Sequence, residues 1–309
     1  MDVILHLGAH RTGSSSFQDY MTRFGSDQVA FWGPRVTRGG LFDGVHGCPV
    51  GTRPRIRAKG RIAVQLARVA ATGAKALVIS DANMIGALRT NLRCATLYPE
   101  IGTRMARLCD AFGGRISRVS IQIRTLDSYW TSALAFGLMR GIAQPDAAAR
   151  ARLVASDRRW RDVITDLACA VPDVPIIVTA FEHHVQRPDQ LADLLTGCRM
   201  APMPAQGIWT NRHPDARRVR ACLDMLDIPN ADALFDPDGH WQPFSPTHRQ
   251  TLRARTAADL AWLRAGAEGL AHFQDHQAFD PAIRAGQRQT HIRGSEDNDS
   301  QNRHMARPC

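Results

Sequence analysis

The chain has 309 residues, of which 44% are hydrophobic, so it is long enough to form one large domain or two small ones around a substantial core. Arginine and lysine outnumber aspartate and glutamate by 39 to 29, and this excess favours an anionic partner, although no zinc-finger, aromatic RNA-binding or basic-zipper pattern points to nucleic acid. The lack of a signal peptide and of any apolar run near the roughly 18 residues that cross a bilayer excludes a membrane span and predicts a cytoplasmic protein.

Short apolar runs typical of buried strands recur along the chain, at residues 3–7, 76–80, 118–124 and 174–181. Amphipathic patterns typical of helices lie between and after them, at residues 17–24, 62–71, 101–112, 128–139, 153–167, 188–196, 214–226 and 247–264. Strands that alternate with helices predict an α/β fold, in which helices flank a central, mostly parallel sheet.

Two segments lack these patterns. Residues 33–61 are rich in Gly, Pro and Arg, and we expect a long surface loop there. Residues 286–309 have almost no apolar side chains, so we expect a disordered polar tail. Because no repeat or linker divides the rest, we expect residues 1–285 to form a single domain.

The segment HLGAHRTGSSSF, residues 6–17, joins the first expected strand to the first expected helix. Gly8 and Gly13 have the G-x-x-x-x-G spacing of a phosphate-binding loop in the strand-to-helix context that this pattern requires. ATP- and GTP-binding loops carry lysine at the position of Ser14, whereas the basic residue of this loop is Arg11. The backbone N–H groups that could turn inward around a phosphate or sulfate are those of Thr12, Gly13, Ser14 and Ser15. The alternative is a glycine-rich turn that only caps a helix.

This loop resembles that of the P-loop sulfotransferases, which use 3′-phosphoadenosine 5′-phosphosulfate (PAPS) and whose loop commonly reads H-x-G-x-x-K-T-G-T-T. The resemblance implies a P-loop NTPase-like three-layer fold, PAPS as cofactor and sulfate donor, and no metal. Arg11 stands where the family usually has lysine, which retains the charge but replaces a point-like ammonium by a broader fork. The residues that match the pattern, and that the resemblance places around the 5′-phosphosulfate with Arg11, are Gly8, Thr12, Gly13, Ser14 and Ser15.

A second family motif lies at residues 121–137, IQIRTLDSYWTSALAFG. In the family, an arginine at the end of a strand and a serine eight positions later hold the 3′-phosphate of the cofactor. Arg124 and Ser132 have this spacing, since 132 − 124 = 8. An arginine can grip a phosphate dianion with two hydrogen bonds while the serine hydroxyl donates a third. The alternative is that Arg124 merely ends a strand and Ser132 merely faces solvent.

The catalytic base departs from the family pattern. Many relatives carry glutamate in a segment like S-D-E-N, whereas this chain has Ala82 at that position, in Ser80-Asp81-Ala82-Asn83. Asp81, His10 and His46 are the candidate replacements, and Asp81 is the first choice because it ends a strand of the sheet. Asp81 could instead cap the following helix. The resemblance also assigns Arg11 to the charge that develops on the leaving phosphate.

The leading functional hypothesis is a sulfotransferase that moves a sulfuryl group from PAPS to a hydroxyl or amine of an acceptor. The acceptor class stays open among glycans, lipids and small metabolites, as does the oligomeric state. The alternatives are a nucleotide-binding protein with an impaired site, a P-loop kinase that uses ATP and, last, a nucleic-acid binder, which would associate with DNA or RNA in a strongly salt-dependent way.

Overall fold

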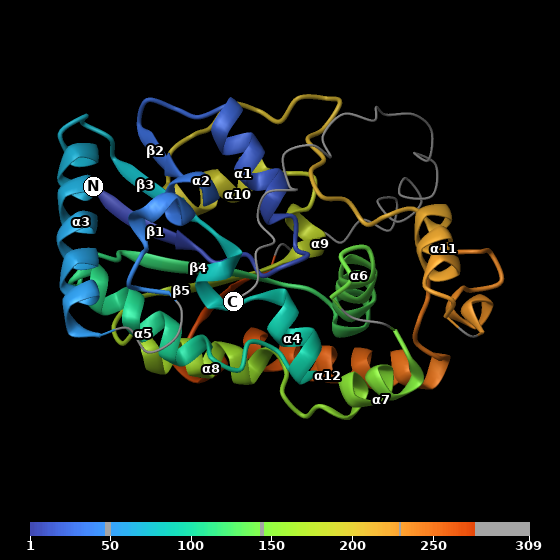
Figure 1. Cartoon of the computed structure of the whole chain (residues 1–309). Coiled ribbons are helices and arrows are strands. Elements are labelled where there is room, and N and C mark those ends of the chain that lie inside the picture. The colour runs from blue at the N-terminus through green and yellow to red at the C-terminus, as the bar shows by residue number, and fades with distance from the viewer. Residues whose placement is uncertain (47–50, 143–144, 229, 276–309) are drawn as a thin grey trace. The chain divides into compact units, whose positions relative to one another are not determined.

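The computed structural model describes residues 1–46, 51–142, 145–228 and 230–275. Within these residues, six strands form one sheet in the order β2-β3-β1-β4-β5-β6, and every pair of neighbours is parallel (Figure 1). The strands are β1 (Asp2–His6), β2 (Val29–Trp32), β3 (Ala76–Ser80), β4 (Arg118–Ile123), β5 (Ile176–Ala180) and β6 (His272–Gln274).

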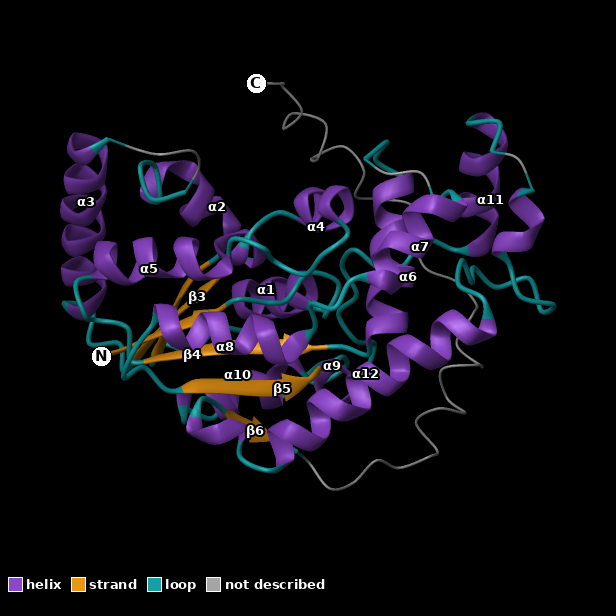
Figure 2. Ribbon diagram, turned by 90° about the horizontal axis from the view of Figure 1, so that it is seen from below, coloured by secondary structure: helices purple, strands orange, loops and turns teal. Residues whose placement is uncertain are grey.

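Helices cover both faces of the sheet (Figure 2). Helices α1 and α10 pack on one face, and α5, α8 and α12 pack on the other. Among the described residues, no helix is long and apolar enough to cross a membrane. The helices are α1 (Ser14–Arg23), α2 (Pro34–Val36), α3 (Thr52–Ala70), α4 (Leu88–Cys94), α5 (Ile101–Phe112), α6 (Leu126–Leu138), α7 (Ala147–Ala155), α8 (Trp160–Ala170), α9 (Phe181–His184), α10 (Pro188–Thr196), α11 (Ala216–Met225) and α12 (Pro246–Arg264), with short helical turns η1 (Thr37–Leu41), η2 (Ala82–Ile85), η3 (Ala231–Leu234) and η4 (Ala267–Gly269).

The central strand β1 supplies both hydrophobic cores because successive side chains of a strand point to opposite faces. Ile4 packs into the core formed with Phe17 of α1 and Leu191 of α10, while Leu5 enters the core that contains Leu167 of α8. All of these side chains are buried. Burial of one such side chain stabilises the fold by about 1.5–3 kcal/mol, so β1 anchors the layers on both sides.

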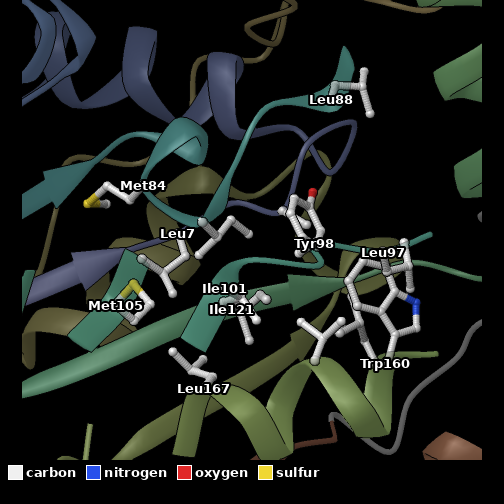
Figure 3. Close-up of a cluster of buried hydrophobic side chains, with 14 of the residues drawn as sticks. Leu7, Met84, Leu88, Leu97, Tyr98, Ile101, Met105, Ile121, Trp160 and Leu167 are labelled. Atoms are coloured by element: carbon white, nitrogen blue, oxygen red, sulfur yellow. The ribbon is translucent and has the colours of Figure 1, made fainter. Parts of the chain in front are cut away.

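Two aromatic residues connect the core that contains Leu5 and Leu167 to the carboxyl end of the sheet. Trp160 and Tyr98 are fully buried beside Leu97 and Ile121 (Figure 3). The indole Nε1–H of Trp160 donates a 2.7 Å hydrogen bond to the carbonyl oxygen of Arg124, the first residue after β4. The packed core therefore fixes the backbone from which the Arg124 side chain extends.

The α/β class and the parallel sheet flanked by helices, as predicted from the sequence, are confirmed, and all four expected strands are present. Strands β2 and β6 were not predicted from the sequence, because runs of four and three residues carry too little periodicity. The predicted tail at 286–309, and with it the domain end at 285, lies outside the described residues.

The prediction of a loop over residues 33–61 is wrong at the short helices α2 and η1 and again from Thr52 onward, where α3 begins. Pro54 falls in the first turn of this helix, where its missing N–H costs no hydrogen bond. Ala58 turns into the core, and Lys59 forms an ion pair with Asp110 of α5. Docking on α5 thus stabilises a helix that composition alone disfavoured. The single helix expected over 153–167 is also wrong, because the chain leaves α7 at Ser156 in an extended conformation before α8 begins.

Replacing Leu5, which is 0% exposed, tests the anchoring role of β1. We expect Leu5→Ala to lower the free energy of unfolding by about 2–5 kcal/mol in urea titrations, because it leaves a cavity in the core. The control Ile56→Ala removes a side chain that is 64% exposed and should change stability by less than about 0.5 kcal/mol. Equal losses in the two variants would contradict this packing.

Candidate anion-binding site

The loop between β1 and α1 lies where the chain order of the sheet reverses. Strand β1 pairs with β3 on one side and with β4 on the other. The chain first adds β2 and β3 on one side of β1 and then adds β4, β5 and β6 on the other side. In parallel α/β sheets, ligands bind in the crevice that opens at the carboxyl ends of the strands at such a point. Residues that follow β1, β3 and β4 therefore meet at one edge, as the sequence pattern implied.

Two glycines in this loop have backbone conformations that L side chains rarely adopt. Gly8 has φ +84°, and a Cβ atom at this position would lie 3.0 Å from the Cβ of Ala82. Gly13 has φ +79° and forms the N-cap of α1, which starts at Ser14. The first N–H groups of a helix have no intrahelical acceptor and point outward at its positive end. The loop thus presents backbone donors of the kind that hold a phosphate or sulfate.

The side chains of Arg11, Arg124 and Ser132 meet beside this loop. The Nε–H of Arg11 donates a 2.9 Å hydrogen bond to the Ser132 hydroxyl, and an Nη1–H of Arg124 donates to the Arg11 carbonyl oxygen at 2.9 Å. The Nε–H of Arg124 donates to Ser128 rather than to Ser132, also at 2.9 Å. The structure therefore brings the three predicted residues together and adds Ser128, which lies one helical turn before Ser132.

Positive charge accumulates around this cluster. Arg11 and Arg140 both lie over the ring of Phe136, at 5.1 Å and 4.2 Å, and Arg124 lies 4.6 Å from the ring centroid of Phe181. Burial, together with the charges of Arg124 and Arg140, lowers the pKa of Arg11 to about 10, so the guanidinium stays charged at neutral pH.

None of the three arginines of this cluster forms an ion pair with an acidic residue in the part of the chain that the structure describes. Arg11 and Arg124 are only partly exposed, so water screens their mutual repulsion less than it would on an open surface, and the carboxylates of Glu182 and Asp127 offset part of it at Arg124. Guanidinium groups form strong bidentate hydrogen bonds with phosphate and sulfate oxygens. An anion placed among Arg11, Arg124 and Arg140 would relieve this repulsion.

A segment that the sequence analysis missed also contacts the loop. The backbone N–H of Thr210 donates to the Ser16 hydroxyl at 3.0 Å, and the side-chain amide of Asn211 donates to the Ser15 hydroxyl at 2.9 Å. Arg11 completes this contact by donating to the Asn211 carbonyl oxygen at 3.1 Å. The sequence WTNRHP, residues 209–214, contains aromatic, basic and amide residues between helices, but it follows no spacing that would have placed it here.

Asp81, the first candidate for the catalytic base, is 1% exposed and fully engaged. Its carboxylate accepts hydrogen bonds from the Thr37 hydroxyl, from two nitrogens of Arg38 and from the backbone N–H of Asn83. Burial alone would raise the pKa of Asp81, but the hydrogen bonds and charge of Arg38, with those from Thr37 and Asn83, hold it below its ordinary value. Asp81 therefore has the geometry of an N-cap for η2, the alternative role, and is a weak proton acceptor.

His10, the second candidate, has both ring nitrogens in hydrogen bonds. Its Nε2 lies 3.1 Å from the Asn83 side-chain oxygen, and its Nδ1 lies 3.1 Å from the Tyr98 hydroxyl. Because the Asn83 oxygen only accepts, the Nε2 carries the proton and the Nδ1 accepts from Tyr98. Burial lowers the pKa of His10 to about 4, so the ring is neutral at pH 7. His46, the third candidate, lies in a separate cavity on the β3 side of the loop.

The described residues also contain one group that could hold a metal ion. Ligand atoms of Asp236, Asp238 and His240 lie within 4.8 Å of one another before α12. Hydrogen bonds within the turn, such as 2.7 Å from the His240 N–H to an Asp236 carboxylate oxygen, account for their proximity.

Comparison with known proteins adds no family assignment: no family model matches the chain, and no curated protein matches it significantly. The functional argument therefore depends on the residues of the site itself.

The substitution Asp81→Asn tests the capping role. The lowered pKa of Asp81 means that its carboxylate stabilises the fold above its unfolded pKa and that this contribution is lost as pH falls through the folded pKa. We expect Asp81→Asn to lower the free energy of unfolding at pH 7 by about 2 kcal/mol. The difference from wild type should shrink toward acid pH in urea titrations.

The control for this prediction is Asp110→Asn, because Asp110 is 51% exposed and its ion pairs with Arg55 and Lys59 lie on the surface. This variant should lose less than about 1 kcal/mol. A stable Asp81→Asn protein would overturn the structural role and leave Asp81 available for proton transfer.

Proposed function

We propose that this protein is a sulfotransferase that transfers the sulfuryl group of PAPS to a hydroxyl or amine of an acceptor. The observation that carries the proposal is the meeting of Arg11, Arg124 and Ser132 with the N-terminus of α1 at the edge of the sheet. The three residues belong to two sequence motifs that lie more than 100 residues apart, and a local pattern alone does not require that they meet. A helix cap alone would not need two arginines that, in the described ranges, form no ion pair with a carboxylate.

In the proposed reaction, the loop N–H groups and Arg11 would hold the 5′-phosphate end of PAPS, and Arg124 with Ser132 or Ser128 would hold its 3′-phosphate. The acceptor oxygen or nitrogen attacks sulfur, the bond from sulfur to the 5′-phosphate oxygen breaks, and the proton of the acceptor passes to a base. Charge then builds on the leaving phosphate, where the loop donors would stabilise it. Such a transfer depends mainly on position and charge neutralisation.

A second candidate is a protein that binds the nucleotide without transferring sulfate. The specific observation that favours it is the state of the proposed bases: Ala82 replaces the glutamate of the family pattern, Asp81 caps η2, and both nitrogens of His10 are engaged. A P-loop kinase is less well supported, because the loop has Ser14 where an ATP-binding loop has lysine.

Calorimetric titration with 3′-phosphoadenosine 5′-phosphate, with ATP and magnesium as the comparison, tests the proposed donor site. We expect the 3′-phosphorylated nucleotide to bind more tightly than ATP. We also expect Arg124→Ala to weaken its binding by about 10- to 100-fold, since a charge-assisted hydrogen bond contributes about 1.5–3 kcal/mol. The same substitution should weaken the binding of adenosine 5′-phosphate, which lacks the 3′-phosphate, much less. Preference for ATP, or an equal loss of affinity for 3′-phosphoadenosine 5′-phosphate and adenosine 5′-phosphate, would count against the proposal.

The hydroxyls of Ser132 and Ser128 form a matched pair for the same assay. The sequence motif assigns the 3′-phosphate to Ser132, whereas the structure pairs Ser132 with Arg11 and Ser128 with Arg124. We expect Ser132→Ala to weaken nucleotide binding by about fivefold, as the loss of one hydrogen bond of about 1 kcal/mol implies. Ser128→Ala should have the smaller effect, and the reverse order would transfer the role to Ser128.

A further inference from the structure

Helix α12 packs against α6, the helix that carries Ser128 and Ser132 (Figure 2). Helix α6 begins at Leu126, two residues after Arg124, so the arginine and the two serines lie on opposite sides of one junction between strand and helix. The angle at which α6 leaves this junction therefore sets how the guanidinium group and the hydroxyls face each other. Polar contacts from α12 hold the junction.

The first N–H group of α6 finds its hydrogen-bond acceptor on α12. Thr125, the N-cap residue of α6, makes no side-chain cap, and the backbone N–H of Leu126 instead donates to the Thr256 hydroxyl at 2.9 Å. The same hydroxyl donates to the carbonyl oxygen of Leu252 at 3.0 Å. Leu126 and Thr256 are both buried, so water cannot replace the lost acceptor if the hydroxyl is removed.

Two further contacts from α12 lie on either side of this one. The Nε–H of Arg253 donates to the Asp127 carboxylate at 2.5 Å. The carboxylate of Asp259 accepts from the backbone N–H of Trp160 at 3.0 Å, and the indole of Trp160 donates to the carbonyl oxygen of Arg124. The three residues of α12 that make these contacts are spaced three positions apart, so they lie on neighbouring turns of one helix face.

The contacts hold the junction against a repulsion between charges. The guanidinium groups of Arg11 and Arg124 repel each other, and the carboxylates of Glu182 and Asp127 offset part of this repulsion at Arg124. The Asp127 carboxylate would also repel a phosphate bound to Arg124 unless a cation neutralised it. Arg253 is that cation, and its side chain is 60% exposed.

Hydrophobic packing alone would hold α12 in place without these polar groups. Leu252 and Leu263 of α12 are buried in the same core as Leu167 of α8. Packing of this kind has no preferred direction, whereas a hydrogen bond fixes the direction of its donor. The polar contacts therefore add orientation at the junction to the adhesion that packing supplies.

We propose that Thr256 and Arg253 are positioning residues for the proposed 3′-phosphate site. Thr256 fixes the first turn of α6 relative to the end of β4, which keeps the Arg124 guanidinium beside the serine hydroxyls. Arg253 neutralises the Asp127 carboxylate near the bound phosphate. This inference rests on the proposed function for the identity of the phosphate, but the geometry of Arg124 can be followed without any nucleotide.

The first experiment follows the Nε–H signal of Arg124 by NMR in the full chain, labelled with ¹⁵N-arginine and free of nucleotide. The substitution Arg124→Lys identifies the signal. We expect it to exchange slowly with water, because this N–H donates to Ser128 at 2.9 Å in a partly buried place. Thr256→Val keeps the size of the side chain but removes the acceptor, and it should shift and broaden the Arg124 signal. Thr256→Ser keeps the hydroxyl and should preserve the signal.

Calorimetry of the same proteins measures the binding of 3′-phosphoadenosine 5′-phosphate and of adenosine 5′-phosphate. We expect Thr256→Val to lower the ratio of the two affinities by about fivefold or more, as the loss of one well-aimed hydrogen bond to the 3′-phosphate implies. Thr256→Ser should keep the wild-type ratio. A hydroxyl with a merely structural role would instead lower the melting temperature and weaken the binding of both nucleotides alike.

Two matched controls lie on α12 itself. The Thr251 hydroxyl also donates to the carbonyl oxygen four residues earlier, at 3.1 Å, but no described residue of another element donates to it, so Thr251→Val should leave the signal and the ratio unchanged. Arg249 lies on the same surface as Arg253 and forms no ion pair in the described ranges. We expect Arg253→Gln to weaken binding of 3′-phosphoadenosine 5′-phosphate by about threefold or more at low salt, and Arg249→Gln to weaken it much less.

The outcomes separate this inference from the donor assignment. If the wild type does not prefer 3′-phosphoadenosine 5′-phosphate to adenosine 5′-phosphate, the donor assignment is wrong, and the Arg124 signal alone decides the positioning role. If the wild type shows this preference and Thr256→Val keeps it, or if Thr256→Val leaves the Arg124 signal unchanged, the positioning role of Thr256 is overturned. Loss of the signal or of the preference in Thr256→Ser overturns it as well. Should Thr256→Val not fold, the exposed Arg253 decides, and equal effects of Arg253→Gln and Arg249→Gln overturn the inference.

Discussion

The place of β1 between β3 and β4 is the constraint on which the rest of this structure depends. Since β1 is central, its side chains fill the cores on both faces, and its carboxyl end opens at the crevice where connections diverge. The loop after β1 then receives neighbours from both sides. Asn83 reaches it after β3, and Arg124 reaches it after β4. The place of β1 thus brings Asn83 and Arg124 to the same loop from opposite sides.

The two sides of the loop use charge differently. Toward β3, the Arg38 guanidinium and the Asp81 carboxylate neutralise each other and fix η2, which is a structural use of charge. Toward β4, the guanidinium groups of Arg11 and Arg124 lie close together and neither forms an ion pair among the described residues, while the carboxylates of Glu182 and Asp127 act on Arg124 from a longer range. Such uncompensated charge is typical of functional sites, since the ligand supplies the missing partner.

A chain of hydrogen bonds ties the loop to the hydrophobic core. Asn91 donates to the Tyr129 hydroxyl, Tyr129 donates to Tyr98, and Tyr98 in turn reaches the ring and backbone of His10. Tyr98 and Tyr129 are fully buried, so this chain resists rearrangement. The packed core therefore holds the loop in one position.

The sequence by itself determined the α/β class, the four longer strands, the loop at residues 6–17 and the pairing of Arg124 with Ser132 as candidates, because strand runs, glycine spacing and an eight-residue interval are local properties. It could not determine β2 and β6, the helical start of α3 at Thr52 or the break before α8, because these depend on contacts such as Lys59 with Asp110. Only the tertiary structure decided that Ser132 pairs with Arg11, that Asp81 forms an ion pair with Arg38, and that residues 209–214 contact the loop. These outcomes depend on distances between residues far apart in the chain, which no local pattern encodes.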